Sequence, residues 1–304
     1  MNGILIVNKP AGMTSQQVVG RVKRVLGVKK VGHTGTLDPD VTGVLPICIG
    51  SATRVAEYLL DQAKAYRGEV TFGVSTTTQD ASGEPVESVD TVQVTEEQVR
   101  EAAASFIGPI LQRPPAFSAI KINGQRAYDL ARQGEEVEIP PREVTIYKLE
   151  ILSLDLEPNH PKVRFDVECS KGTYVRTLCQ DLGSTLGVPA HMSHLVRTRS
   201  GPFTLEQALT FEQIEELAAA GQIAEQLQPL QSALPHLTAA TIPEALERRV
   251  DNGRELTLRR VIPGAQAGQL VRIESRTGRL LALYRIESIV DGETHTVPEK
   301  VFKE

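Results

Sequence analysis

The chain has 304 residues and a formal net charge of −5, and 40% of its residues are hydrophobic, so it can bury the core of one large domain plus a small one. Its three cysteines share no C-x-x-C spacing, which argues against a disulfide framework or a thiolate zinc site and favours a reducing cytoplasm. The N-terminus lacks a secretion signal and no apolar run reaches membrane-spanning length, so we expect a cytoplasmic protein that is neither exported nor membrane-inserted.

The negative net charge argues against a nucleic-acid partner, but charge is unevenly distributed along the chain. The first 37 residues carry six basic residues and no acidic one, and the stretch from Lys171 to Arg199 carries four basic residues against Asp181 alone. Glutamates instead concentrate between Glu206 and Glu225. Local basic surfaces permit RNA binding, although uneven surface charge by chance explains the pattern equally well.

Hydrophobic periodicity predicts helices and strands that are intermixed along the chain. In chain order the expected elements are a strand at 3–7, a helix at 15–26 capped by Ser15, a strand at 64–74, a helix at 99–107, strands at 144–154 and 163–169, a turn and helix at 172–186, and a helix around 211–226. This irregular order favours an α+β fold over repeated βαβ units.

Two segments stand apart from these elements. The segment from Gln112 to Arg142 has prolines at both ends and is longer than a connection needs to be, so it is either a functional arm or an ordinary surface excursion. The proline-marked segment at 229–243 indicates a domain boundary near residue 235. Beyond it, strand-like runs separated by glycines predict a compact β module; they lie at 255–260, 270–273 and 279–286.

The loop from Gly32 to Gly43 places one carboxylate, Asp38, among glycines and prolines that let the backbone turn sharply and approach a ligand. Asp38 is therefore a candidate catalytic residue. The alternative is a helix N-cap, because Pro39 follows it. Gly43 and Pro46 leave little room for such a helix, which weakens that alternative.

His33 in the same loop is a candidate base, metal ligand or stacking ring, and a lone histidine is more often a packed residue. A metal site built from His33, Asp38 and Asp40 lacks the spacing and the further ligands it would need, so we expect no metal. A glycosidase that uses Asp38 and Asp40 is a competing interpretation, but neighbouring loop acids need not face one substrate.

Two further clusters contain candidate partners for Asp38. Lys64-Ala-Tyr66 precedes the pattern Gly-x-x-Thr-x-Thr-x-Asp-x-x-Gly at 73–83, and Tyr66 is either a stacking platform with a reactive hydroxyl or a packed aromatic. Arg176 lies in the first turns of the predicted helix at 172–186, where it either pairs with a buried carboxylate or faces solvent. The preceding Lys-Gly-Thr turn lacks Walker spacing, which argues against a nucleoside triphosphatase.

Together and in this order, the three clusters resemble the TruB family of pseudouridine synthases, which make pseudouridine at position 55 of the tRNA T-loop. The resemblance extends to the segments at 7–15 and 114–121, with Gly124 and Tyr128 after them. In the C-terminal part it includes the Asn252-Gly253 turn and the segment 297–302.

The resemblance implies the pseudouridine synthase fold, a mixed and largely antiparallel central sheet with flanking helices, followed by a small β-barrel-like domain of PUA type. We accordingly expect a catalytic domain at 1–235, with a thumb-like RNA-binding insertion at 112–142. A PUA-like RNA-binding domain is expected at 236–304.

By the same resemblance, Asp38 corresponds to the catalytic aspartate, Tyr66 to the active-site tyrosine against the target base, and Arg176 to the arginine paired with the aspartate. Five more residues are implied as substrate or RNA contacts: His33, Thr36, Lys64, Tyr174 and Leu195. His33 would help to hold the opened T-loop, whereas Tyr174 and Leu195 would line the pocket.

The chemistry explains why these residue types suit the reaction. Isomerising uridine breaks the N1–C1′ bond and joins C5 to C1′ without redox change or net addition of water, so no cofactor is expected. One carboxylate suffices, because uracil departs as a stabilised anion that is retained. Arg176 would hold the carboxylate ionised and Tyr66 would position the base. Whether Asp38 attacks C1′, adds to C6 or removes a 2′ proton stays open.

The expected partner is tRNA, bound at its T-loop and T-stem by a monomer without an obligate protein partner. Basic residues at 21–30 and 197–199 would contact phosphates. The main alternative is a tRNA-binding folding chaperone with accessory catalysis. A guide-RNA-dependent synthase is disfavoured, because the compact chain has no long basic extension.

Overall fold

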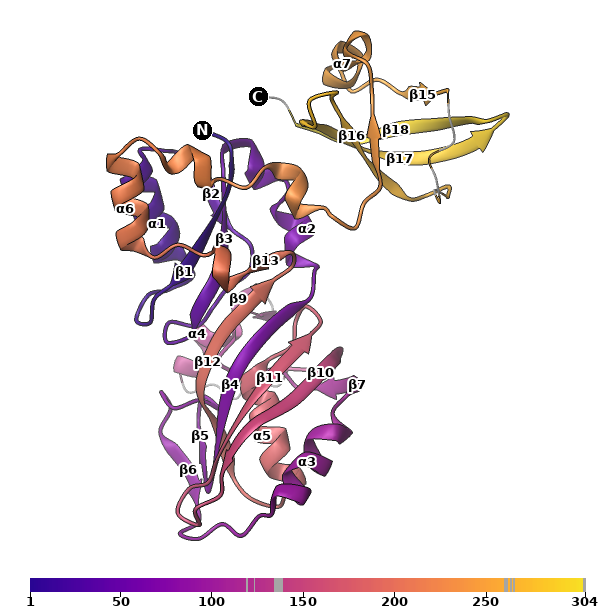
Figure 1. The fold of residues 1–304 in the computed structure, drawn as a ribbon. Helices are drawn as coiled ribbons and strands as arrows, with labels where there is room; N and C mark the ends of the chain where they lie inside the picture. Colours follow the sequence, from indigo (N-terminus) through magenta and orange to yellow (C-terminus); the bar gives the residue numbers. More distant parts are fainter. Residues whose placement is uncertain are drawn as a thin grey trace.

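The computed structural model describes residues 1–118, 120–122, 124–133, 139–259, 262, 264 and 266–302. A large sheet with flanking helices forms most of the molecule, and the C-terminal part of the chain forms a separate smaller sheet (Figure 1). The predicted α+β class is thus confirmed. Within the described ranges, no helix is both long enough and apolar enough to cross a membrane.

The large sheet has nine strands, and nearly all of its pairings are antiparallel, as expected. Its strands are β1 (Gly3–Lys9), β2 (Val31–His33), β3 (Thr42–Ile49), β4 (Lys64–Phe72), β7 (Gly108–Gln112), β10 (Arg142–Asp155), β11 (Lys162–Cys169), β12 (Ala190–Ser200) and β13 (Phe203–Thr204). They run in the order β1-β3-β12-β4-β11-β10-β7, with β2 paired to β3 and β13 to β12. The pair β3–β12 is parallel and brings the N-terminal loops beside the later half of the chain.

Helices flank this sheet (Figure 1). They are α1 (Ser15–Leu26), α2 (Ala56–Leu60), α3 (Glu96–Ser105), α4 (Ala127–Arg132), α5 (Val175–Thr185) and α6 (Phe211–Ala219), whereas α7 (Glu244–Asp251) lies beside the C-terminal sheet. Short 3-10 helices lie at Gly50–Arg54, Leu205–Gln207, Ile223–Gln226 and Leu230–Ala233. Two small hairpins complete the set, β5 (Val74–Thr76) with β6 (Pro85–Ser88), and β8 (Lys121–Ile122) with β9 (Gln125–Arg126).

The N-cap of helix α1 lies one residue earlier than predicted. Thr14, in extended backbone conformation, is the N-cap: its side chain accepts a hydrogen bond from the Gln17 backbone, and the Gln17 side chain accepts one from the Thr14 backbone. Ser15, which the sequence predicted as the cap, is instead buried and turned toward the loop at residue 37. Gly27 ends the helix with φ of 63°, a left-handed conformation that favours glycine.

The C-terminal part folds into a sheet of five strands: β14 (Ala239–Thr241), β15 (Leu256–Leu258), β16 (Leu270–Glu274), β17 (Leu280–Val290) and β18 (Glu293–Val301). Their order is β14-β16-β17-β18-β15, and this sheet with α7 encloses an apolar core of its own that includes Ile242, Ile273 and Tyr284. The compact β module predicted from the glycine-separated runs is therefore present.

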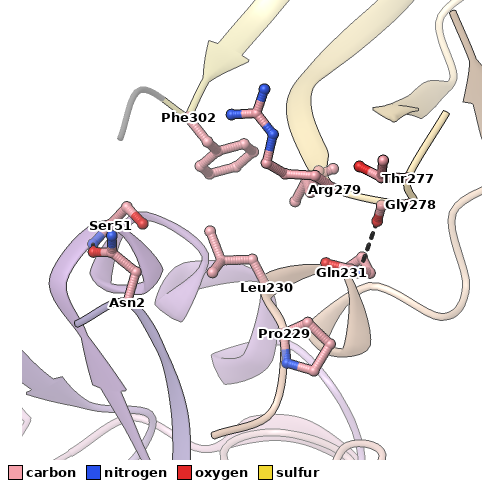
Figure 2. A pocket seen from close by; sticks show the side chains of 10 residues that line it. Asn2, Ser51, Pro229, Leu230, Gln231, Thr277, Gly278, Arg279 and Phe302 are labelled. Atoms are coloured by element: carbon pink, nitrogen blue, oxygen red, sulfur yellow. Dashed lines mark hydrogen bonds between the residues drawn. The ribbon is translucent and has the colours of Figure 1, made fainter. Parts of the chain in front are cut away.

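Direct contacts join the two sheets. Leu234 belongs to a buried apolar cluster that also contains Leu283 of β17 and Phe302. Figure 2 shows the same junction, where Leu230 and Phe302 line a small hollow of about 270 Å³. Beside it, Gln231 Nε2 donates to the Gly278 carbonyl at 2.8 Å. The C-terminal module is therefore packed against the larger unit.

Gly43 offers a test of the close approach between β3 and β12. Its φ is 104°, and a Cβ there would lie 2.3 Å from the Arg197 carbonyl oxygen. We expect Gly43→Ala to lower the free energy of unfolding by about 2–5 kcal/mol, because it adds both backbone strain and overlap. Urea unfolding measures this change.

Gly20→Ala is the matched control, because Gly20 lies in the exposed interior of α1 with nothing within 4 Å of an added Cβ. Alanine should raise stability there by about 0.5–1 kcal/mol. A Gly43→Ala protein that unfolds at the wild-type urea concentration contradicts the proposed packing constraint.

Candidate active site

The loop that carries Asp38 joins β2 to β3 and is held on both sides of the aspartate. Before it, Ser15 Oγ accepts a hydrogen bond from the Leu37 backbone N–H at 2.9 Å and donates one to the Leu37 carbonyl at 3.3 Å. After it, Lys9 Nζ donates to the Pro39 carbonyl at 2.7 Å. No helix follows Asp38, since the next element is β3, so the helix-cap alternative is excluded.

Lys9 is a buried cation whose ammonium group is committed to this loop. Its side chain is inaccessible to solvent, and burial lowers its pKa to about 8, against the opposing effect of Asp40 and Asp38. The ammonium therefore fixes the backbone at Pro39 and is not available on the surface. The sequence counted Lys9 among the basic residues of a possible RNA-binding face, and its burial removes it from that set.

Arg176 lies in the first turn of α5 and connects three segments of the chain. Its buried guanidinium places Nε 3.1 Å from Asp38 Oδ2. Nη1 donates to the Thr78 carbonyl at 2.9 Å, and Nη2 donates to the Phe117 carbonyl at 3.0 Å. A second carboxylate, Asp80, has its Oδ2 3.7 Å from Nη1. All three guanidinium nitrogens are thus engaged, and Arg176 holds a fixed direction toward Asp38.

The pKa of Asp38 is raised above its ordinary value. Burial is the largest cause, and the neighbouring carboxylates of Asp80 and Asp40 add to it, while Arg176 and Lys9 lower it. The side chain still exposes 46% of its surface, and that surface borders a pocket. Asp38 is therefore a carboxylate in a partly desolvated position, kept ionisable chiefly by Arg176.

This pocket has a volume of about 570 Å³, within the usual range for small-molecule sites. One wall is the segment 192–195 of β12, and a second is the turn that contains Asp80. The predicted arm at 112–142, called the arm below, supplies a third wall through Phe117 and Tyr128. Their rings meet edge to face with centroids 6.3 Å apart. Apolar, carboxylate and guanidinium groups thus surround a single cavity.

The turn around Asp80 is a functional feature that the sequence reasoning did not assign. Asp80 Oδ1 accepts hydrogen bonds from Thr78 Oγ1 at 2.7 Å and from Ser82 Oγ at 2.6 Å. Between them, Gln79 adopts a left-handed φ of 65°, and its side-chain oxygen accepts from Thr177 Oγ1 at 2.8 Å. The Thr-x-Asp-x-Ser spacing is a local signal for such a turn and lay within the recognised pattern.

Of the remaining predicted residues, Leu195 lies in the pocket wall and is buried. Tyr66 is half-buried on β4 and does not belong to the described lining of the pocket. It pairs with Arg197 across β4 and β12, and the two side chains interact. Burial raises the pKa of Tyr66, and Arg197 opposes that rise.

His33 and Thr36 lie in the loop before Asp38, outside the described lining of the pocket. Thr36 is exposed, whereas His33 is half-buried with a buried Nδ1 that has no hydrogen-bond partner. Burial lowers the pKa of His33, and Arg197 lowers it further, so the imidazole is neutral at pH 7. A neutral ring suits stacking better than ion pairing.

Lys64 and Tyr174 also lie outside the described lining, because both are engaged elsewhere. Lys64 Nζ donates to the Leu60 carbonyl at 2.6 Å, at the end of α2, and burial lowers its pKa to about 8. The Tyr174 ring lies below the guanidinium of Arg142, 5.1 Å from its centroid. Of the eight predicted site residues, the pocket brings together Asp38, Arg176 and Leu195.

Arg197 differs from its predicted surface role. It is 1% exposed, and its Nε donates to the Val44 carbonyl at 2.7 Å, so it cannot contact a phosphate on the surface. Arg199 is more accessible and forms an ion pair with Glu168 at 2.5 Å. The parallel pairing of β12 with β3, absent from the sequence prediction, explains the burial of Arg197.

Neither a metal site nor a disulfide emerges from the described part of the chain. Its His, Cys, Asp and Glu residues form no group of three or more arranged to hold a metal ion. The cysteines at 48, 169 and 179 are buried thiols, and burial raises the pKa of each.

Comparison with known families identifies the class of protein. The TruB family pseudouridylate synthase N-terminal domain matches residues 23–175, and the tRNA pseudouridylate synthase B C-terminal domain matches residues 176–235. The fold also aligns with a structure described as an H/ACA RNP bound to a substrate RNA containing 2′-deoxyuridine. That alignment has a TM-score of 0.78 and 28% identity over 99% of this chain and 85% of the other. The family models and the fold thus define a pseudouridylate synthase.

Two bacterial relatives narrow this class. A protein of Bacillus licheniformis named tRNA pseudouridine synthase B is 46% identical over 285 residues, 93% of this chain and 92% of the relative. The protein of the same name from Bacillus subtilis is 44% identical over 289 residues, 93% of each chain. The chain belongs to the TruB family.

The geometry predicts that Arg176→Lys raises the pKa of Asp38 further. A lysine ammonium cannot reach Asp38 and the carbonyls of Thr78 and Phe117 together, so it would stabilise the ionised carboxylate less than Arg176 does. Burial, which raises the pKa of Asp38, would then be less compensated. The carboxyl would then lose its proton at higher pH. A ¹³C NMR titration of the Asp38 carboxyl, assigned with Asp38→Asn, measures this shift.

Arg164→Lys is the control, because Arg164 is an exposed arginine of β11 that pairs with Glu69 instead. It should leave the Asp38 titration at its wild-type position. An unchanged Asp38 midpoint in Arg176→Lys contradicts the role assigned to Arg176.

Proposed function

We propose that this protein converts uridine to pseudouridine in tRNA, at position 55 of the T-loop, and that Asp38 promotes cleavage of the glycosidic bond. The observation that carries the proposal is the Asp38–Arg176 pair, 3.1 Å apart in the wall of a pocket of nucleoside size. Membership of the TruB family and the names of the Bacillus relatives support tRNA as the substrate.

The reaction is an isomerisation whose atoms balance within the substrate. The N1–C1′ bond breaks, and its electron pair leaves with uracil as an anion. The base rotates in the pocket, C5 forms a bond to C1′, and the proton lost from C5 is balanced by the proton gained at N1. No oxidant, reductant or net water enters, so the protein has to supply charge stabilisation, positioning and exclusion of water.

Asp38 suits the step that breaks the glycosidic bond. In ionised form it can attack the sugar carbon or take a proton, as carboxylates do in glycoside cleavage. Partial burial makes the carboxylate more reactive but harder to ionise, and Arg176 limits the second effect. Asp80, beside the same guanidinium, helps to hold Arg176 in place.

The pocket would receive a uridine that has left its stack. Extruding a base costs a few kcal/mol, which contacts inside the pocket must offset. Leu195 and Met192 offer an apolar surface to the base, and the arm residue Phe117 closes the opposite side. Tyr66 is assigned to position the detached base, which requires it to approach the pocket from its present place on β4.

The other predicted contacts are proposed as RNA-binding residues. His33 and Thr36 lie in the loop before Asp38, where a neutral ring and an exposed hydroxyl can meet the opened T-loop. Lys64 and Tyr174 already bind within the protein, so RNA contact by either requires those interactions to be exchanged. Their assignment rests on family resemblance.

Three surfaces would fix the orientation of the tRNA. The arm at 112–142 borders the pocket, and the helix α1 with the turn after it carries Lys23, Arg24, Lys29 and Lys30 for phosphate contacts. We assign residues 1–235 to the catalytic domain and 236–304 to a PUA-like RNA-binding domain. We further propose that the protein acts as a monomer, without a protein partner or cofactor, in the cytoplasm.

Asp38→Asn tests the catalytic assignment. The amide keeps the shape of the side chain but cannot act as base or nucleophile, so isomerisation should fall by at least about 10²- to 10⁴-fold. Tritium release from C5-labelled tRNA measures the rate, and a gel-shift titration checks that tRNA still binds. Asp155→Asn, at an exposed aspartate at the end of β10, should remain near the wild-type rate. Full activity of Asp38→Asn excludes this aspartate as catalyst.

The substrate position has a separate test. The purified chain alone, incubated with a T-arm stem-loop, should produce pseudouridine at position 55, which chemical labelling and primer extension locate. A stem-loop with cytidine at that position should give no product. Modification at another uridine, or a requirement for a second protein, contradicts the proposed site or the proposed independence.

A further inference from the structure

Both ends of the arm meet the turn that precedes α5. Gln112, the last residue of β7, pairs with Arg142, the first residue of β10. Gln112 Oε1 accepts a hydrogen bond from the Tyr174 backbone N–H at 2.7 Å, and Gln112 Nε2 donates to the Tyr174 carbonyl at 3.0 Å. Arg142 donates to the Gly172 carbonyl and covers the Tyr174 ring. The base of the arm therefore binds Tyr174, which is the N-cap of α5.

Helix α5 has no side-chain cap, and the backbone of its N-cap is bound by Gln112 from outside the helix. The N-caps of α1, α3 and α6 are Thr14, Thr95 and Thr210, and each forms a capping box with its own helix. The N-cap of α5 is Tyr174, whose side chain makes no capping hydrogen bond. Gln112, 1% exposed, binds both polar groups of the Tyr174 backbone instead. The start of α5 is thus fixed by a residue 62 positions away in sequence.

The position of this helix start decides where Arg176 points. Arg176 follows Tyr174 by two residues, so a displacement of the Tyr174 backbone moves the guanidinium relative to Asp38 and Thr78. The arm holds the same arginine a second time, through the Phe117 carbonyl. Arm contacts therefore lie on both sides of Arg176, one at the helix start and one at the guanidinium.

We propose that Gln112 is a positioning residue for the isomerisation, which sets the start of α5 and thereby places Arg176 against Asp38. Gln112 thereby connects the base of the arm to the Asp38–Arg176 ion pair. Gln112 does not belong to the described lining of the pocket, so its effect reaches the reaction through Arg176. The inference rests on the proposed role of Asp38.

Gln112→Leu tests this inference, because leucine fills similar space but has no amide. We expect kcat on the T-arm stem-loop to fall on the order of 10- to 100-fold, the cost of a small misplacement of reacting groups, with KM unchanged. The acidic limb of the kcat–pH profile should move to higher pH, since a displaced Arg176 opposes the raised pKa of Asp38 less. Leu111→Ala, on the same strand at a 74% exposed side chain, is the control and should change neither.

A second variant and a second readout separate positioning from general destabilisation. Gln112→Glu keeps the acceptor for the Tyr174 N–H, so its kcat should lie between those of the wild type and Gln112→Leu. Hydrogen exchange should quicken at the Leu178 amide, which bonds to the Tyr174 carbonyl in the first turn of α5. The corresponding Val18 amide of α1 should be unaffected.

Arg176→Lys distinguishes a failure of the Gln112 inference from a failure of the proposed function. If it moves the acidic limb while Gln112→Leu retains wild-type kcat and pH profile, the positioning role of Gln112 is wrong. If Arg176→Lys and Asp38→Asn both leave the kinetics unchanged, the proposed function fails instead. Should Gln112→Leu not fold, Gln112→Glu decides, and wild-type kinetics in that variant overturn the inference.

Discussion

The buried guanidinium of Arg176 has a partner for each of its three nitrogens, and these contacts organise the site. Its partners come from the loop after β2, the turn after β5, and the arm between β7 and β10. These segments are far apart in sequence, and no single helix or strand contains them. The ion pair with Asp38 is one of several bonds that together specify a single position for the arginine, and with it the charge next to the carboxylate.

The site balances two opposing demands on Asp38. A reactive carboxylate gains from partial removal of water, yet removal of water favours the neutral form. Burial raises the pKa of Asp38, and the neighbouring carboxylates of Asp40 and Asp80 raise it further. The cations Arg176 and Lys9 lower it. The Lys9 ammonium is itself buried, and burial disfavours its charged form and lowers its pKa to about 8. The loop is thus built from groups that would each be unfavourable alone.

The sequence was sufficient for the local elements and for the chemistry-bearing residues, because both depend on short-range patterns. Alternation identified β4 and β11, and the order of three clusters pointed to Asp38 and Arg176, which the fold brings within 3.1 Å. The parallel contact of β3 with β12, the burial of Arg197 and the bond from Gln112 to Tyr174 depend on long-range pairing that no local pattern specifies. The cap of α1 was misplaced by one residue, since Thr14 and Ser15 are equally suitable by composition and only the loop contact of Ser15 separates them.

The apolar cluster shared by the two sheets fixes how far apart the larger and the smaller unit lie. Leu234 and Ala233 of the larger unit pack with Leu283 and Phe302 of the smaller one, and Gln231 is bonded to Gly278 across the junction. Under the proposed function, a duplex bound by both units would have to match the separation that this junction sets. If both units bind tRNA as proposed, the junction would act as a ruler that rejects an RNA whose loop lies too near or too far along the helix, without reading any base in between.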